Sequence, residues 1–186
     1  MGSSRARSTG SGRRLSGVLD RIEIDDPRAE DVAALLDAHL SFARGHTPPE
    51  HAHALDTDGL LDPAVTFFSL RRGGRLLGVG ALKMLDPHHA EVKSMHTAQE
   101  ARGTGVGRAM LEHLLAVARA RGVTRVSLET GSMEAFAPAR ALYASAGFVP
   151  CRPFADYRES PNNSYMTLEL GPQAGPAPAP RVRERP

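Results

Sequence analysis

Apolar residues follow two different spacings along the first half of the chain, and each predicts a type of element. A short strand is predicted over 18–24, and helical spacing predicts a helix over 28–44. Two β-rich runs, 65–70 and 76–85, flank a Gly-Gly pair and predict a hairpin, and a third strand is predicted over 91–97. The face that defines the helix consists of Val32, Leu35, Leu36, His39, Leu40 and Ala43.

The second half alternates helices with strands. After a glycine-rich turn over 102–107, helical spacing that includes Met110 and Leu114 predicts a helix ended by Gly122. The remaining predicted elements are a strand over 123–130, a helix over about 137–146, a strand opened by Gly147-Phe148 and a closing strand over 164–170. This order predicts a mixed α/β fold, in which an antiparallel meander leads into a parallel crossover.

The two ends of the chain differ in composition from its middle. Residues 1–17 are rich in Ser, Gly and Arg and residues 171–186 in Pro and Ala, so both are predicted to be disordered tails around one domain, 18–170. The first tail holds four arginines and no acid, and the second holds three arginines and one glutamate. Because the net charge is +2, the domain itself carries −4, which argues against a nucleic-acid footprint and favours a cationic substrate.

Composition also excludes several classes of protein. No apolar run approaches the roughly 18 residues that a membrane helix needs, and no apolar segment follows the first arginines as in a secretory signal. Cys151 is the only cysteine, which excludes an internal disulfide and a cysteine-cluster zinc site and fits the cytoplasm. His51 and His53 supply only two metal ligands, so no metal is expected. The sequence does not decide whether the chain forms a homodimer.

The segment with the clearest chemical content is the turn at 102–107, Arg-Gly-Thr-Gly-Val-Gly, between a strand and a helix. Its glycines leave backbone N–H groups uncovered, and the helix that follows adds free donors and a positive dipole end, which suits a phosphate. A P-loop would need Lys-Ser/Thr where the chain has Arg108-Ala109, and a Rossmann glycine would fall on Arg108 or Met110. A tight turn that binds nothing is the alternative.

Two motifs resemble one superfamily. The spacing Arg102-x-x-Gly105-x-Gly107 resembles motif A of the GNAT acyl-CoA N-acyltransferases, and Ala139-x-x-Leu142-Tyr143-x-x-x-Gly147-Phe148 resembles their helix-to-strand segment. The resemblance implies the GNAT fold, with a mixed sheet of about six to seven strands flanked by helices. It also implies that the turn binds the pyrophosphate of coenzyme A and that Tyr143 lies near the coenzyme sulfur.

A closer resemblance, over about residues 20–170, is to the bacterial YsnE-like acetyltransferases. It is carried by Pro48-Pro49-Glu50 with His53-Ala54-Leu55, Gly80-Ala81-Leu82-Lys83, Glu91-Val92-Lys93-Ser94-Met95, Leu128-Glu129-Thr130-Gly131-Ser132-Met133 and Pro153-Phe154-Ala155-Asp156-Tyr157. The chain departs from the pattern at two positions. Phe136 stands where many GNATs have Asn, and His96 stands where the YsnE-like pattern has Arg.

The resemblance implies direct transfer of acetyl from acetyl-CoA to an amine, without a covalent enzyme intermediate and without a metal. Backbone N–H groups near 95–97 would stabilise the thioester oxygen, and Tyr143 would protonate the leaving thiolate, since a phenol of pKa about 10 can serve a thiolate of about 8.5. The residues predicted to bind the coenzyme are Met95, His96, Thr97, Arg102, Gly103, Thr104, Gly105, Val106, Gly107, Arg108 and Ala139.

Three residues are candidates for the general base that deprotonates the amine. Glu91 ranks first, because it begins the strand leading into motif A, eleven residues before Arg102, as in histone-type GNATs. Glu129 ranks second, because it ends the parallel partner strand near the point where the two strands should diverge. His96 has a suitable ordinary pKa near 6.5. Deprotonation through a chain of water molecules, with no dedicated base, fits the sequence equally well. Each of the three residues could also have only a structural role.

The acceptor is predicted to bind near the segment 47–55 and near the connection before the last strand. Candidate contacts are Glu50, His53, Ser132, Asp156 and Tyr157, and an acidic rim of Glu50, Glu91, Glu129 and Asp156 would suit an amine. We therefore expect a small amine or amino-acid-like acceptor. The alternatives are a peptide or protein acceptor, and a catalytically silent acyl-CoA-binding sensor.

Overall fold

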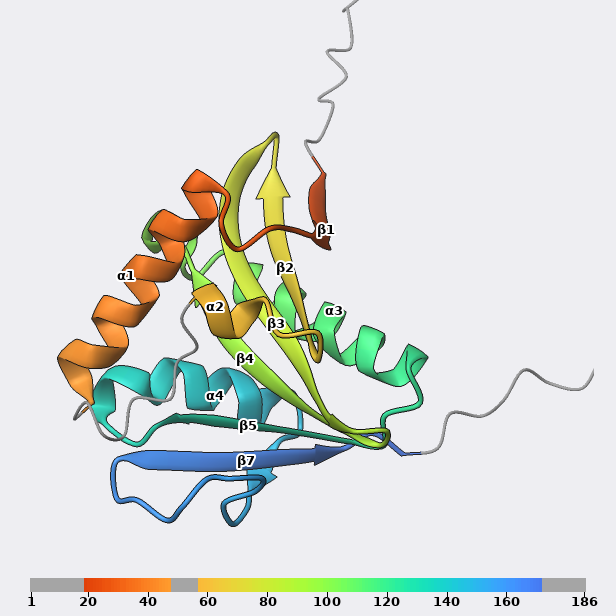
Figure 1. Cartoon of the computed structure of the whole chain (residues 1–186). Helices are drawn as coiled ribbons and strands as arrows, with labels where there is room; N and C mark the ends of the chain where they lie inside the picture. The colour runs from red at the N-terminus through yellow and green to blue at the C-terminus, as the bar shows by residue number, and fades with distance from the viewer. Residues whose placement is uncertain (1–18, 48–56, 172–186) are drawn as a thin grey trace, which may run out of the picture.

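A seven-stranded mixed sheet is the framework of the part of the chain that the computed structural model describes, residues 19–47 and 57–171 (Figure 1). The strands are β1 (Asp20–Ile24), β2 (Val65–Arg72), β3 (Arg75–Asp86), β4 (His89–Thr97), β5 (Arg125–Gly131), β6 (Val149–Pro150) and β7 (Asn163–Glu169). They lie in the order β1-β2-β3-β4-β5-β7-β6, and only the β4–β5 pair is parallel. The predicted fold class is confirmed, with its meander and its parallel crossover.

Helices cover both faces of this sheet (Figure 1). They are α1 (Glu30–His46), α2 (Thr57–Leu60), α3 (Val106–Ala120) and α4 (Ala137–Ser145), with 3-10 turns at Gln99–Ala101 and Glu134–Phe136. Apolar residues of α1 and α2 pack against Val79 and Ala81 of β3, whereas α3 lies over Gly78 and Gly80. Because successive side chains of a strand point to opposite faces, these two groups of helices lie on opposite sides of the sheet.

The element boundaries are close to those expected from the hydrophobic pattern. The helix expected over 28–44 spans Glu30–His46. Met110 and Leu114, on the apolar side of the helix predicted after the glycine turn, are in the core. The four-residue α2 was not expected. The predictions for 1–17, for most of the tail 171–186 and for Glu50 and His53 fall outside the described residues.

The parallel strands β4 and β5 separate partway along their length. They pair only from His89↔Arg125 to Val92↔Leu128, after which β4 stays with β3 and β5 stays with β7. The β3–β4 register shifts between Val79 and Ala81, so β4 has one extra residue there, and Ser94 has a positive φ of 50°. This β-bulge and the separation together leave a gap between β4 and β5 at one end of these two strands.

Two glycines of β3 let α3 approach the sheet closely. A Cβ at Gly80 would lie 2.9 Å from Cγ of Met110, and one at Gly78 would lie 2.9 Å from Cγ1 of Val106. Gly78 also pairs with Thr97, the last residue of β4. The N-terminus of α3 therefore begins beside the end of β4, where the sheet opens. No helix among the described residues is long and apolar enough to cross a membrane.

Candidate active site

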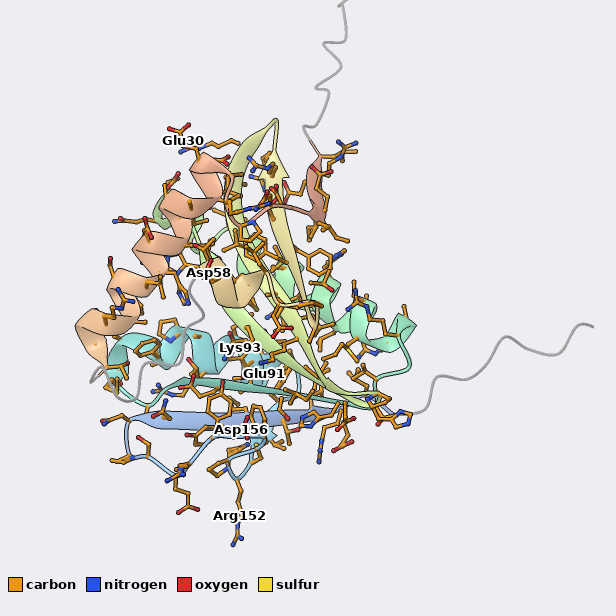
Figure 2. The ribbon with its side chains drawn as sticks, in the orientation of Figure 1. Glu30, Asp58, Glu91, Lys93, Arg152 and Asp156 are labelled. Atoms are coloured by element: carbon orange, nitrogen blue, oxygen red, sulfur yellow. The ribbon has the colours of Figure 1, made fainter. Side chains whose placement is uncertain are left out.

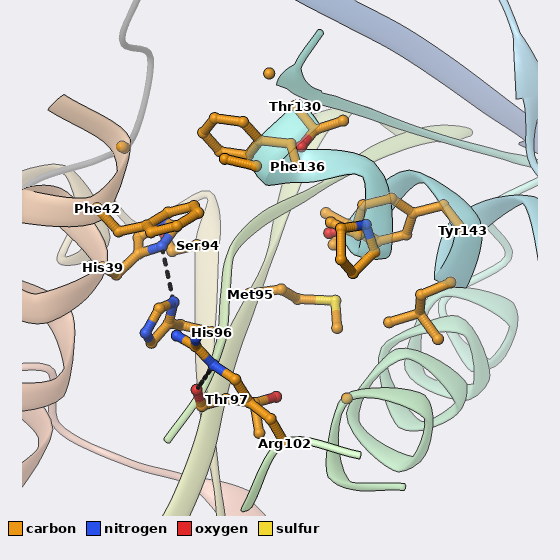
Figure 3. A pocket seen from close by; sticks show the side chains of 18 of the residues that line it. His39, Phe42, Ser94, Met95, His96, Thr97, Arg102, Thr130, Phe136 and Tyr143 are labelled. Carbon is orange, nitrogen blue, oxygen red and sulfur yellow. Dashed lines mark hydrogen bonds between the residues drawn. The ribbon is translucent and has the colours of Figure 1, made fainter. Parts of the chain in front are cut away.

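A pocket of about 550 Å³ lies where β4 and β5 separate (Figure 3). Its walls come from four places: α1, the second half of β4, the glycine turn with the start of α3, and the segment from the end of β5 to α4. The segments that resemble the two GNAT motifs, far apart in the sequence, thus line one cavity. The separation of the strands makes room for a ligand that a continuous sheet would exclude.

The glycine turn presents open backbone to this pocket. Gly103 and Gly105 have φ values of +75° and +91°, and a Cβ at either would meet no atom within 4 Å. Gly105 caps α3 in the left-handed conformation, and the first N–H groups of a helix have no acceptor within it. Arg102 and Arg108 both line the pocket beside the turn. The arrangement fits a phosphate-bearing ligand, as the spacing of the glycines predicts.

The pocket contains most of the residues predicted to bind the coenzyme. Those that line it are Met95, His96, Thr97, Arg102, Gly103, Gly105, Gly107, Arg108 and Ala139. Thr104 and Val106 are not among its lining residues. The hydroxyl of Thr104 donates to the carbonyl of Ala101 at 2.7 Å, and Val106 is buried in the core.

Tyr143 of α4 lines the same pocket and is 7% exposed. Its ring packs against Phe148, with centroids 5.9 Å apart, and its hydroxyl has no hydrogen-bond partner among the described residues. Burial, together with the nearby carboxyl of Glu129, raises the pKa of Tyr143 above its ordinary value. The phenol is therefore protonated at neutral pH and available as a proton donor.

Glu91 belongs to a buried network beside the pocket. Its Oε1 accepts hydrogen bonds from the hydroxyl of Tyr157 at 2.6 Å and from Nζ of Lys93 at 3.2 Å. Glu91 and Lys93 lie close together in Figure 2. Lys93 lines the pocket, whereas Glu91 and Tyr157 do not. Burial and the Glu91 carboxylate raise the pKa of Tyr157. Glu91 lies where β4 still pairs with β5, opposite Ser127.

Among the described residues, Glu129 is the carboxylate that lines the pocket. It is the first residue of β5 beyond the last pair with β4, and its Oε1 accepts a hydrogen bond from Nδ2 of Asn163. Burial raises the pKa of Glu129, although Asn163 and the charge of Lys93 oppose that shift. The predicted position of Glu129, at the point where the strands diverge, agrees with the structure.

The predicted acceptor residues that the structure describes, Ser132, Asp156 and Tyr157, lie outside the pocket. Ser132 donates its hydroxyl proton to the carbonyl of Pro161 at 2.6 Å, and Asp156 is exposed on the connection before β7. The expected acidic rim does not form around the described part of the cavity, where Glu129 is present and Asp156 and Glu91 are absent. The connection that carries Asp156 packs over the sheet through Phe154 and Tyr157, whose rings contact Tyr165 of β7, and Asp156 between them is exposed.

The structure adds pocket residues that sequence reasoning did not assign to the site: His39 and Phe42 of α1, and Lys93 and Ser94 of β4. His39 interrupts an otherwise apolar helix face, which was the one available signal. Ser94 is 7% exposed, and its Oγ has no partner among the described residues. Its position depends on the bulge, which no local pattern predicts. The described residues contain no cluster of three His, Cys, Asp or Glu side chains that could hold a metal.

The fold and the pocket define the class of the protein. A mixed sheet whose one parallel pair separates beside an open glycine turn is the architecture of an acyl-CoA N-acyltransferase. Residues 31–148 match the model of the acetyltransferase (GNAT) family, so the chain belongs to this family and is an acetyltransferase.

Relatives of known sequence agree with this membership. The chain is 47% identical to an uncharacterized N-acetyltransferase, YsnE, of Bacillus subtilis, over 80% of this chain and 99% of that protein. It is 33% identical to an IAA acetyltransferase of Azospirillum brasilense, over 78% of this chain and 95% of that protein. A GNAT family acetyltransferase of Elizabethkingia anophelis, solved with acetyl-CoA bound, has a similar fold, with a TM-score of 0.61 and 17% identity over 81% of this chain and 98% of that one.

Proposed function

We propose that this acetyltransferase transfers acetyl from acetyl-CoA to the primary amine of a small molecule, by direct attack while both substrates are bound. The observation that carries the proposal is one cavity lined by the open glycine turn, by Tyr143 and by Glu129. A phosphate-binding surface, a proton donor and an anionic group are the three features that such a transfer requires. The acetyl-CoA bound to the Elizabethkingia neighbour supports the choice of donor.

In this proposal the turn and the start of α3 bind the diphosphate, with help from the charges of Arg102 and Arg108. The thioester then lies along the edge of β4 that has no strand partner beyond Val92. Backbone N–H groups on that edge, near Met95–Thr97, are available to stabilise the thioester oxygen as it gains charge. Holding both substrates in one cavity supplies a further part of the rate enhancement.

Tyr143 serves as the proton donor to the departing thiolate. Its protonated, buried hydroxyl without a protein partner supports this role. Glu129 attracts the acceptor's ammonium group, because its carboxylate lines the described part of the pocket. Glu91 has a supporting role, in which it fixes Lys93 and Tyr157 behind the pocket.

The acceptor side of the cavity favours a small molecule over a peptide. Phe42 of α1 meets Phe136, with ring centroids 5.1 Å apart, and a Cβ at Gly131 would lie 2.4 Å from the Phe136 ring. This contact joins α1 to the start of α4 across the acceptor side, where a peptide would need an open groove. A cytoplasmic location completes the proposal, since Cys151 is a free thiol.

Calorimetry with acetyl-CoA, followed by thiol release over a panel of acceptors, tests the proposed function. The panel contains small amines, amino acids, short peptides and IAA, the compound named for the Azospirillum relative. We expect binding of acetyl-CoA and thiol release with at least one small amine. Release with peptides alone would support a peptide acceptor, binding without release would support a silent sensor, and no binding would overturn the proposal. Light scattering of the same samples decides between a monomer and a homodimer.

A further inference from the structure

Two histidines from different elements meet inside the pocket. His39 comes from α1 and His96 from β4, 57 residues apart in the sequence, and their Nδ1 atoms lie 3.3 Å from one another (Figure 3). Their ring centroids are 5.0 Å apart, and both side chains line the cavity. His96 directly follows Met95 at the bulged part of β4. The proposed transfer uses neither ring so far.

The contact between the two Nδ1 atoms fixes how protons are distributed over the pair. One Nδ1 must carry a proton and the other must accept it, because two protonated or two unprotonated nitrogens cannot form this hydrogen bond. In two neutral rings, the donor ring then has an unprotonated Nε2 and the acceptor ring has a protonated Nε2. The pair thus offers one proton acceptor and one proton donor at its two outer ends.

The surroundings keep both rings neutral. Burial lowers the pKa of His39 to about 4, with a smaller contribution from Lys93 of β4. Burial also lowers the pKa of His96 to about 4, and His39 and Arg102 add to that shift. A proton that stayed on either ring would meet these positive charges. Both rings are therefore neutral at neutral pH, which is the state from which a proton relay starts.

The carboxylates are less suited to carrying the proton away. Glu91 does not line the cavity and already accepts two hydrogen bonds, from Tyr157 and from Lys93. Glu129 lines the cavity, but its Oε1 already accepts a hydrogen bond from Asn163, and the proposed function uses its charge to attract the ammonium group. A carboxylate that holds an ammonium group by attraction also loses that attraction once it takes the proton.

We propose that His39 and His96 form a proton relay, which takes the proton that the acceptor ammonium must lose before it attacks the thioester. This inference rests on the proposed function. One ring's Nε2 accepts the proton, the Nδ1 proton crosses to the other ring, and that ring releases its Nε2 proton to solvent. The pair ends in the opposite tautomer and returns by proton exchange with water.

The proton balance of the whole reaction is closed. The amine nitrogen forms a bond to the acetyl carbon, and the bond between that carbon and sulfur breaks. Of the two protons that the ammonium loses, the first leaves through the relay as H⁺. Tyr143 gives its proton to the thiolate as the bond to sulfur breaks. The second proton leaves the nitrogen as the amide forms and replaces the proton that Tyr143 has given away.

His39→Asn and His96→Asn test the relay, because an amide can keep a polar contact at the Nδ1 position but cannot pass a proton through a ring. We expect each variant to lower kcat by about 100-fold and to keep its acetyl-CoA affinity. Activity of the variants should rise with pH, since more of the amine is then already deprotonated. The double variant should be no worse than either single one, because the two rings act as one unit.

His46→Asn is the matched control on the same helix. His46 is exposed, its Nδ1 lies 2.8 Å from the Phe42 carbonyl, and it does not line the pocket. Wild-type kcat with a wild-type pH profile in both relay variants would overturn the relay. A loss of acetyl-CoA affinity equal to the loss of kcat would also overturn it, because that result indicates a packing role.

Imidazole nitrogen NMR on the full-length wild-type protein gives a second readout, which does not need an acceptor. We expect one ring of the pair to carry its proton on Nδ1, and we expect that signal to disappear in the His39→Asn and His96→Asn variants. Two rings that are both protonated only on Nε2 would overturn the relay even if acetyl transfer is observed. If the Nδ1 proton is observed but no acceptor is found, the result counts against the proposed function and leaves the histidine contact intact.

Discussion

Ser94 combines a strained backbone with an unsatisfied side chain. Its φ of 50° lies in the left-handed region, which costs a residue with a Cβ roughly 1–2 kcal/mol. Its buried Oγ has no partner among the described residues, and such a hydroxyl costs roughly 1–3 kcal/mol. Both features lie on the pocket wall. Strain of this kind is retained at positions where a bound ligand uses the group.

Ser94→Ala is therefore expected to stabilise the free protein while it lowers kcat/KM. Removal of the unsatisfied hydroxyl should raise the free energy of unfolding by about 1 kcal/mol, measured by urea denaturation. Ser69→Ala is the matched control, because Ser69 is equally buried but donates to Oδ2 of Asp25 at 2.6 Å. That variant should lose about 1 kcal/mol and keep its activity. Destabilisation of both variants would contradict the assignment.

Tyr143→Phe removes the proposed proton donor and leaves the ring packing on Phe148 unchanged. We expect kcat to fall about 100-fold while the acetyl-CoA affinity from calorimetry stays within about a factor of two. Tyr165→Phe is the control, because the Tyr165 hydroxyl donates to the Arg158 carbonyl and does not line the pocket. Equal turnover in Tyr143→Phe and the wild type would remove the acid role.

Glu91→Gln distinguishes a structural role of Glu91 from a role as the general base. The variant removes the carboxylate charge from the ion pair with Lys93 and weakens the hydrogen bond from Tyr157, and this should cost about 3 kcal/mol of unfolding free energy. We expect the dependence of kcat on pH to keep its wild-type shape, because Glu91 lies outside the pocket. Activity that is lost at neutral pH and recovered at high pH would instead make Glu91 the base.

At the scale of elements, the turn before α3 is the part of the site most sensitive to backbone conformation. Gly105 has a φ of +91° and begins α3, while Gly74 has a φ of +84° in the hairpin between β2 and β3. A Cβ at either position meets no atom within 4 Å. The two glycines therefore have the same conformational requirement, but only Gly105 faces the pocket.

Gly105→Ala and Gly74→Ala form a matched pair. Both should lose roughly 1–2 kcal/mol of stability, because Ala is strained at a positive φ. Only Gly105→Ala should weaken acetyl-CoA binding in calorimetry, by about tenfold, since the turn must shift and its N–H groups no longer converge. Equal affinity in the two variants would show that the turn does not bind the coenzyme.

At the scale of the whole molecule, the buried histidine pair links stability to pH. Both pKa values fall from an ordinary 6.5 to about 4 on folding. Between these values the unfolded chain binds more protons than the folded one, so the free energy of unfolding rises as pH rises from about 4 to about 6.5. Each histidine contributes up to about 1.4 kcal/mol per pH unit in this window and nothing further above it.

Urea denaturation at several pH values between 4.5 and 7 measures this slope. The double variant His39→Asn/His96→Asn should have a flatter profile than the wild type over the same window. Identical profiles for the wild type and the double variant would show that the two rings are not neutral and buried in solution.

Local sequence was sufficient to predict most of the elements and the glycine turn that borders the pocket. Apolar spacing located the helix at Glu30–His46 and the strands within a few residues, because burial of one face imposes a period of 3.6 or 2 on each element. The glycine turn was found from local spacing as well, because a tight turn into a helix needs glycines at fixed positions, whereas Tyr143 was found from the resemblance of its segment to a GNAT motif. Such features depend on neighbouring residues alone.

Only the tertiary structure decided the acceptor side. Glu91 and Glu129 both occupy strands of the predicted site, yet one lies where β4 and β5 still pair and the other lies just beyond their separation. His39 and His96 meet across 57 residues, and Ser94 faces the pocket because of an extra residue in β4. Strand register, the bulge and the docking of α1 arise from long-range packing, so no local spacing along the chain determines which polar side chains converge.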